Sequence, residues 1–309
     1  MIKYVIILLD RTSTAFCYAN NPYEDKQLIS INILKDAIRW SMKENLRIQF
    51  VYPDYELPET HRSVINSIDH AEIKHNSDAD VTVINGWDEY KNIKAESPSI
   101  VIRLTKKDIF DNPENVHSLL ECNGHVSVVI KDIVTFTQED MHFYHQLISD
   151  LGQKVVTKTI NGKMPKINIL TNRLVLSSMN NCNAGTESIT IAHNGNFYIC
   201  PSFFYENEDD CVGNLKEGLN IKNGQLYKLA YAPICRQCDA YQCRRCIWLN
   251  RKTTLEVNTP SHEQCVISHI ERNASRRILN DMRNYVELPY DIQIEELDYL
   301  DPFEKLIRK

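Results

Sequence analysis

The sequence has no early apolar run long enough for a signal peptide or a membrane span. The run at residues 4–9 stops at Asp10 and Arg11, whereas the apolar core of a signal peptide needs ~7–15 residues. We interpret this run as a β-strand. The sequence therefore predicts a cytoplasmic protein without a membrane partner.

Basic charge and the common catalytic motifs are also missing. Lys and Arg number 35 against 41 Asp and Glu, a net charge of -6, whereas a nucleic-acid-binding chain usually has a strong basic excess. The sequence has no glycine-rich phosphate loop, nucleophile elbow or His-Glu-x-x-His motif. We therefore expect no nucleic-acid partner and find no support for standard nucleotide hydrolysis, acyl transfer or zinc proteolysis.

The first ~170 residues alternate between strand-like and helix-like segments. This pattern is typical of mainly parallel α/β sheets and barrels. The helix after Thr137 is expected to run to Leu151 and to end at Gly152. Strands are expected at residues 4–9, 47–52, 81–85, 100–104, 126–130 and 166–170. Six strands with intervening helices favour a partial (β/α)6 barrel over the closed barrel of eight strands.

The character of the chain changes near residue 176. Residues 1–176 carry the alternating pattern, residues 177–270 are rich in cysteine and turn-forming residues, and residues 271–309 begin as a helix and become acidic. Asn194-Gly195 predicts a hairpin turn that would also position Cys200. We therefore expect a barrel, a cysteine-rich domain with short hairpins, and a C-terminal helix with an acidic tail.

Cysteine is concentrated in the second of these segments, because eight of the ten lie between residues 182 and 265. The stretch CRQCDAYQCRRC, residues 235–246, contains two Cys-x2-Cys pairs separated by four residues. Many tetrathiolate zinc modules have ~15–20 residues between their pairs, and the closer spacing is more typical of iron-sulfur sites. Five basic residues against one acid between residues 233 and 252 would offset the negative charge of a thiolate-ligated centre.

The order of the cysteines resembles a known domain. Cys182, Gly195-x4-Cys200, the two pairs of residues 235–246 and Cys265 together resemble the SPASM domain, the C-terminal module of many peptide-modifying radical SAM enzymes. The resemblance covers about residues 177–273. The two inner spacings of the central group are each one residue shorter than in that family.

This resemblance implies two auxiliary 4Fe-4S clusters with interleaved ligands. One cluster would be held by Cys235, Cys238, Cys243 and Cys265, and the other by Cys182, Cys200 and Cys246. The last position of the second cluster would be open to the hydroxyl of Ser188, to Cys211 or to a substrate thiolate. Structural zinc is the alternative to iron and sulfur, since all-cysteine sites of either kind occur.

The predicted barrel resembles that of radical SAM enzymes but lacks their Cys-x3-Cys-x2-Cys motif. At that place the chain reads DRTSTAFCYANNP, with Cys17 alone, whereas three thiolates are needed to hold the SAM-binding cluster. We therefore expect neither bound SAM nor radical chemistry. The stretch YVIILLDRTSTAFCYANN and the C-terminal cysteines resemble the CXXX repeat peptide maturase family, radical SAM-like proteins associated with cysteine-rich ribosomal peptides.

The resemblance implies maturation of a cysteine-rich ribosomal peptide. The precursor peptide would be one partner, and a radical SAM enzyme or another maturation protein a second. The clusters would hold substrate thiols or relay electrons, and the chain would be either the peptide maturase or its catalytically degenerate partner. A competing hypothesis is a peptide-binding adaptor whose cysteines only hold structural zinc.

Two residues after the first strand are candidates for catalysis, because α/β folds bind ligands at the carboxyl ends of strands. Cys17 would serve as a redox or thiol-exchange residue, and Asp10 would contact substrate or a nucleotide-like ligand. The alternatives are a buried, inert cysteine and a polar loop that caps a helix.

Overall fold

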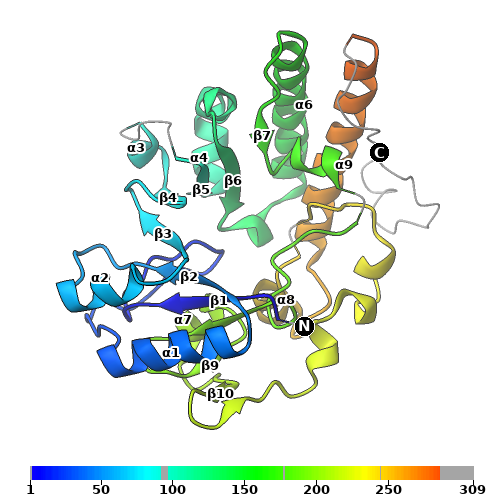
Figure 1. Cartoon of the computed structure of the whole chain (residues 1–309). Coiled ribbons are helices and arrows are strands. Elements are labelled where there is room, and N and C mark those ends of the chain that lie inside the picture. Colours follow the sequence, from blue (N-terminus) through cyan, green and yellow to red (C-terminus); the bar gives the residue numbers. More distant parts are fainter. Residues whose placement is uncertain (1, 92–96, 177, 244, 286–309) are drawn as a thin grey trace. The chain divides into compact units, whose positions relative to one another are not determined.

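The computed structural model describes residues 2–91, 97–176, 178–243 and 245–285, coloured along the chain in Figure 1. The chain divides into two compact units, each assembled from two separate stretches. Unit 1 comprises residues 1–84 and 182–231, and unit 2 comprises residues 85–181 and 232–309. The predicted acidic tail, from residue 287 onward, lies outside the described residues.

Unit 1 is built around strands in the order β4-β3-β2-β1-β8-β9. All of these strands are parallel except β9, which pairs antiparallel with β8. A separate antiparallel pair, β10 and β11, follows. The strands are β1 (Tyr4–Leu8), β2 (Arg47–Val51), β3 (Ala71–His75), β4 (Val81–Asn85), β8 (Ser188–Ile191), β9 (Phe197–Tyr198), β10 (Gly213–Asn214) and β11 (Gly218–Leu219).

The helices of unit 1 begin where the sequence supplies capping groups or proline. Ser30 accepts a hydrogen bond from the backbone N–H of Ile33 and so caps α1. Pro201 starts α7 directly after Cys200. The helices are α1 (Ile31–Lys43), α2 (Glu59–Ile65), α7 (Pro201–Glu206) and the 3-10 helices η4 (Gly224–Tyr227) and η5 (Leu229–Tyr231).

Unit 2 contains three parallel strands, β5 (Ser99–Leu104), β6 (His125–Ile130) and β7 (Lys166–Ile167), in the order β7-β6-β5. Its α-helices are α3 (Trp87–Tyr90), α4 (Lys106–Asp111), α5 (Pro113–Ser118), α6 (Gln138–Ile160), α8 (Ile247–Thr254) and α9 (His262–Arg283). Its 3-10 helices are η1 (Leu119–Glu121), η2 (Ile133–Thr135), η3 (Asn172–Val175) and η6 (Cys235–Gln237).

The structure confirms the α/β class and corrects several element boundaries. Residues 71–75 form β3, which the sequence did not predict, because only Ile73 of this stretch is buried and the apolar signal is weak. The strand expected at 166–170 ends at Ile167. There the hydroxyl of Thr171 accepts a hydrogen bond from the Ile167 N–H at 2.8 Å and turns the chain.

Gly152 does not end a helix as expected, because α6 continues to Ile160. The predicted N-terminus of this helix is confirmed, since Thr137 and Asp140 form a capping box. Helices α6 and α9 run side by side (Figure 1). A Cβ on Gly152 would lie 3.1 Å from Cγ1 of Ile278 on α9, so the glycine serves the close approach of the two helices.

No helix among the described residues combines the length and the apolar character needed to cross a lipid bilayer.

Replacing Gly152 with valine is expected to destabilise the protein by about 1–3 kcal/mol, because the added methyl groups would overpack the contact with Ile278. The measurement is the free energy of unfolding in urea. Gln153→Val is the matched control, since Gln153 is exposed on the same helix. Equal stability of the two variants would contradict a tight contact between α6 and α9.

Candidate functional site

Two cysteines of the 235–246 stretch have the local geometry of metal-binding knuckles. The sulfur of Cys238 accepts a hydrogen bond from the N–H of Ala240 at 3.4 Å, and that of Cys243 accepts one from the N–H of Arg245 at 3.3 Å. In each case the donor lies two residues after the cysteine. Such donors favour the charged form of the sulfur, which is the form that binds a metal.

The thiols of Cys235, Cys238 and Cys243 are close enough to influence one another. Burial raises the pKa of Cys235 to about 11, with a smaller contribution from Cys238. Burial also raises the pKa of Cys243 to about 12, and the charges of Cys235 and Cys238 contribute further. The thiols of Cys235 and Cys243 are therefore neutral at pH 7 unless a cation lies beside them, and a bound metal would deprotonate them.

Buried guanidinium groups lie near these thiols. Arg173 on η3 is 1% exposed, and its charge acts on Cys243, Cys238 and Glu271. Its Nη1 donates to Ser275 Oγ at 3.5 Å, whereas its Nε and Nη2 have no hydrogen-bond partner within the described part of the chain. Burial lowers the pKa of Arg173 to about 10, so the group stays charged at pH 7. A buried cation of this kind fits a neighbouring anionic group.

The basic residues expected to offset thiolate charge are only partly those found beside the sulfurs. Arg245 is buried and lowers the pKa values of Cys235 and Cys243. Arg244 lies outside the described residues. Arg173 was missed because it lies about sixty residues before Cys235, and nothing in its local sequence points to the thiols.

Helix α9 brings two further candidate ligands to unit 2. Cys265, which is half-buried, and His269 are four residues apart and therefore lie on one face of the helix. Nε2 of the buried His269 is 3.6 Å from Sγ of Cys238. The sequence prediction did not include His269, and its spacing of four from Cys265 was the only signal. Cys246 is half-buried and is the N-cap residue of α8.

The other predicted ligands lie in unit 1. The hairpin predicted at Asn194-Gly195 is confirmed by the antiparallel pair β8–β9, with Gly195 at φ +83°. It leads to Cys200, which is buried at the start of α7. Cys182 is exposed, Cys17 is half-buried and Cys211 is exposed.

Asp10, the other catalytic candidate, is fully buried and holds its own loop together. Its carboxylate accepts hydrogen bonds from the N–H of Thr12 at 2.7 Å, from the Thr12 hydroxyl at 2.6 Å and from the Tyr55 hydroxyl at 2.6 Å. Its N–H donates to Ser13 Oγ at 3.0 Å. These contacts give Asp10 a structural role, and its catalytic role stays a prediction.

Within the described ranges no three His, Cys, Asp or Glu side chains are arranged to hold a single metal ion. A 4Fe-4S cluster binds each cysteine through a different iron, so its thiols stand further apart than the ligands of one ion. Cys235, Cys238 and Cys243 act on one another electrostatically without forming a site for one ion, and this arrangement is compatible with a cluster.

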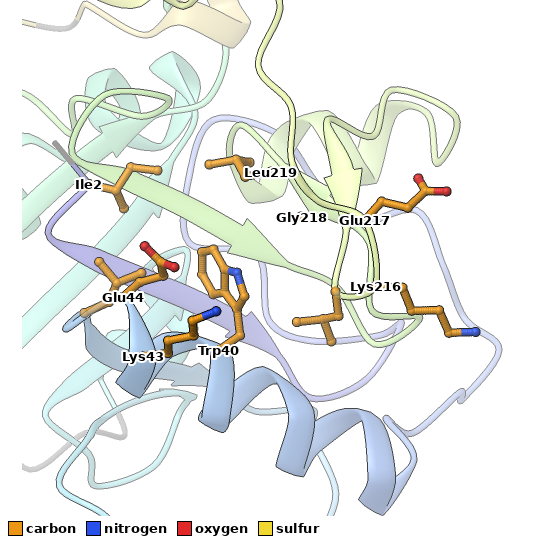
Figure 2. Close-up of a pocket in the computed structure, with 10 residues that line it drawn as sticks. Ile2, Trp40, Lys43, Glu44, Lys216, Glu217, Gly218 and Leu219 are labelled. Atoms are coloured by element: carbon orange, nitrogen blue, oxygen red, sulfur yellow. The ribbon is translucent and has the colours of Figure 1, made fainter.

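Two cavities of unit 1 are large enough for a ligand. One, of about 620 Å3, lies between the end of α1 and the β10–β11 turn; Figure 2 shows Trp40 and Lys43 on one side and Glu217 on the other. The second, of about 640 Å3, follows the carboxyl ends of β2 and β3 and is lined by Tyr52, Lys74 and neighbours. The second position is where α/β sheets usually bind ligands.

Comparisons with known proteins show similarity in structure only. No protein-family model and no curated protein sequence matches the chain. A solved structure of the radical SAM enzyme anSMEcpe, in a histidine-tagged form with bound AdoMet, has a TM-score of 0.62 at 11% identity, covering 92% of this chain and 96% of that chain. The structure of native anSMEcpe with bound AdoMet and Cp18Cys peptide has a TM-score of 0.61 at 12% identity, covering 92% and 100%.

The expectation that SAM is not bound was wrong, because the solved structures that share this fold contain bound AdoMet. The expectation was based on the missing cysteines around Cys17. The number of cysteines indicates how an iron-sulfur cluster could be bound. Cofactor binding also uses the polar groups and cavities at strand ends, which a cysteine count does not test. The chain has the α/β fold of radical SAM enzymes.

Replacing Asp10 with asparagine is expected to destabilise the protein by about 2–3 kcal/mol, because three donors lose a charged acceptor. The measurement is the free energy of unfolding. Asp25→Asn is the control, since the Asp25 side chain is 54% exposed and pairs with Arg11, and it is expected to cost less than about 1 kcal/mol. An Asp10→Asn variant of unchanged stability that loses activity would instead identify a catalytic role.

Proposed function

We propose that this chain is an iron-sulfur protein that takes part in the maturation of a cysteine-rich precursor peptide. The observation that carries the proposal is the group of three neighbouring thiols, Cys235, Cys238 and Cys243, beside the buried guanidinium of Arg173. The fold supports it, because anSMEcpe, an anaerobic sulfatase-maturating enzyme with this fold, was solved with bound peptide.

The residues of unit 2 fit an iron-sulfur cluster in ligand type and in charge. Cys235, Cys238, Cys243 and Cys265 would supply four thiolates. The N–H groups of Ala240 and Arg245 already donate to two of the sulfurs. When bound, this cluster with its four thiolates would supply electron transfer. A coordination site for a substrate thiol would belong to the second cluster, which has an open position. The second ligand set, Cys182, Cys200 and Cys246, stays a prediction from the resemblance.

Arg173 would act as a permanent positive charge next to this site. Folding removes the guanidinium from water, so no further desolvation of Arg173 is needed when the site is loaded. Nε and Nη2 provide donors that the described protein atoms do not use. Arg245 adds a second buried cation beside Cys235. Together they stabilise the thiolate forms of the ligands.

The cavity after β2 and β3 is the proposed position of the peptide. Tyr52, Lys74 and His75 line it and offer groups that can hydrogen-bond to a peptide backbone or to acidic side chains. AdoMet is proposed as a further ligand of unit 1, as in the solved structures with this fold. The same proposal includes three further points: the chain belongs to the CXXX repeat peptide maturase family, its substrate is made on the ribosome, and it is located in the cytoplasm.

Anaerobically purified protein is expected to contain about eight irons and eight sulfides, the content of two 4Fe-4S clusters. Cys235→Ala is expected to lose about half of each, because one ligand set is broken. Arg173→Met should lower the iron content as well, whereas Arg173→Lys, which keeps the charge, should retain more. The measurement is iron and acid-labile sulfide per chain, with an absorption spectrum of the same sample.

Cys122→Ala is the control for these variants, because Cys122 is also buried in unit 2 and contacts Tyr90 rather than the other thiols. It should keep the wild-type iron content. Wild-type protein without iron and sulfide, or a Cys235→Ala variant with undiminished content, would contradict the iron-sulfur proposal.

One observation favours the competing function, a zinc-stabilised peptide-binding adaptor. Zn–S and Zn–N bonds of ~2.3 and ~2.0–2.1 Å at a tetrahedral angle separate the two ligand atoms by roughly 3.6 Å. The distance from Cys238 Sγ to His269 Nε2 has this value, 3.6 Å. Bound zinc without sulfide, lost on replacing His269 with phenylalanine, would establish this alternative.

A peptide with cysteine at every fourth position is expected to bind at least tenfold more tightly than the same peptide with serine, because a thiolate is a stronger ligand than a hydroxyl for the open iron of the second cluster. AdoMet is expected to bind the same preparation. Lys74→Ala should weaken peptide binding, whereas Lys35→Ala, at an exposed position of α1, should not. The measurement is anaerobic calorimetry, and equal affinity for the two peptides would contradict the role of the thiols.

A further inference from the structure

We propose that Cys17, Cys182 and Cys200 of unit 1 supply thiolates to one iron-sulfur cluster. Cys17 would be the third ligand from unit 1, in preference to the Ser188 hydroxyl and Cys211, and the fourth iron would stay open to a substrate thiolate. The inference rests on the proposed function, because it takes iron-sulfur binding by this chain as given. It assigns a ligand role to a cysteine that stands alone in the sequence.

The loop that carries Cys17 is attached to the helix that Cys200 precedes. On α7, the Tyr205 hydroxyl donates to the carbonyl oxygens of Ser13 at 3.1 Å and Thr14 at 3.4 Å. The Tyr23 hydroxyl donates to the carbonyl oxygen of Phe204, also on α7, at 3.3 Å. These bonds lie on both sides of Cys17 in sequence. They hold its loop against α7, whose N-cap residue is Cys200.

Arg11 fastens the same loop to the segment after α7. Its Nη2 is 2.5 Å from Oε1 of Glu208, and its Nη1 is 2.5 Å from Oδ2 of Asp25. The guanidinium also lies 4.1 Å from the centre of the Tyr23 ring. The position of the loop is therefore set by contacts that do not involve any cysteine, so it is fixed before a cluster binds.

Tyr4 connects Cys182 to the same region. Its strand, β1, runs parallel to β8 with Tyr4 opposite Ser188. The Tyr4 hydroxyl donates to the carbonyl oxygen of Cys182 at 3.0 Å. Burial raises the pKa of Tyr4, and the charges of both Cys182 and Cys17 add to this effect. Both sulfurs therefore lie within electrostatic reach of a single phenol.

Cys200 is influenced by the same two thiols. It is 8% exposed. The charges of both Cys17 and Cys182 act on it, so the three sulfurs lie within electrostatic reach of one another. Three thiolates this close would repel one another in a site removed from water, and a bound iron-sulfur cluster would supply the compensating positive charge.

The two other protein groups considered for this position are less suitable. The Ser188 hydroxyl is engaged with Tyr4 and donates to the carbonyl oxygen of Cys182 at 3.4 Å. Cys211 is exposed, and its charge acts on Tyr198 of β9. Cys17, by contrast, lies within electrostatic reach of Cys200 and of Tyr4, the residue that binds the Cys182 carbonyl oxygen.

The first test is iron and sulfide content of anaerobically prepared alanine variants. Cys17→Ala, Cys182→Ala and Cys200→Ala are each expected to lose about four of the eight irons and sulfides. The double variant of Cys17 and Cys200 should lose no more than either single variant, because both residues serve one cluster. Cys211→Ala is the control and should keep the wild-type content.

The outcomes separate this inference from the proposed function. Full content in Cys17→Ala, together with a loss of half in Cys182→Ala, would overturn the role of Cys17 and leave the iron-sulfur proposal intact. Wild-type protein without iron and sulfide would overturn the proposed function itself.

A second measurement on the wild-type protein decides the matter if Cys17→Ala does not fold. Iodoacetamide labelling followed by mass spectrometry is expected to modify Cys211 at once and to leave Cys17 unmodified while the iron is bound. Removal of the iron with a chelator and an oxidant should increase the labelling rate of Cys17 at least tenfold. An unchanged rate would overturn the inference.

Discussion

A buried positive charge is the constraint on which the thiol site of unit 2 depends. Arg173 is 1% exposed, and a guanidinium removed from water is stable only near negative charge. Glu271 provides one such charge and is itself held by the Tyr144 hydroxyl at 2.6 Å. The thiols of Cys238 and Cys243 lie in the field of the same guanidinium. Burial keeps the Cys243 thiol neutral until a metal binds, and the guanidinium then lowers the cost of the negative charge that its thiolate carries.

The packing of α6 against α9 fixes where these groups lie. Gly152 permits the close approach of the helices. Helix α9 carries Cys265, His269 one turn later, and Glu271 two residues further on. A change in the spacing of α6 and α9 would therefore move Cys265, a proposed ligand, together with Glu271, the negative charge near Arg173. The site is thus supported by a helix pair in the core rather than by the cysteine-rich loop alone.

In unit 1 the loop that carries Cys17 is likewise positioned by residues distant in sequence. Hydrogen bonds from Tyr205 and ion pairs of Arg11 hold the segment after β1, and Asp10 closes it from inside. Cys17 is consequently held near Cys200, although 183 positions separate them in the sequence. Both units place thiols in surroundings formed by residues distant in sequence.

The sequence by itself determined the features that depend on near neighbours. The Cys-x2-Cys pairs, the capping box at Thr137 and the hairpin at Asn194-Gly195 could be predicted because spacing and turn chemistry act over a few residues. Tertiary structure decided the rest. Arg173, His269 and the neighbours of Cys17 have no local pattern that reports their partners, and AdoMet binding by a fold cannot be judged from one short motif. Electrostatic and coordination contacts depend on distance in space, which long-range packing sets.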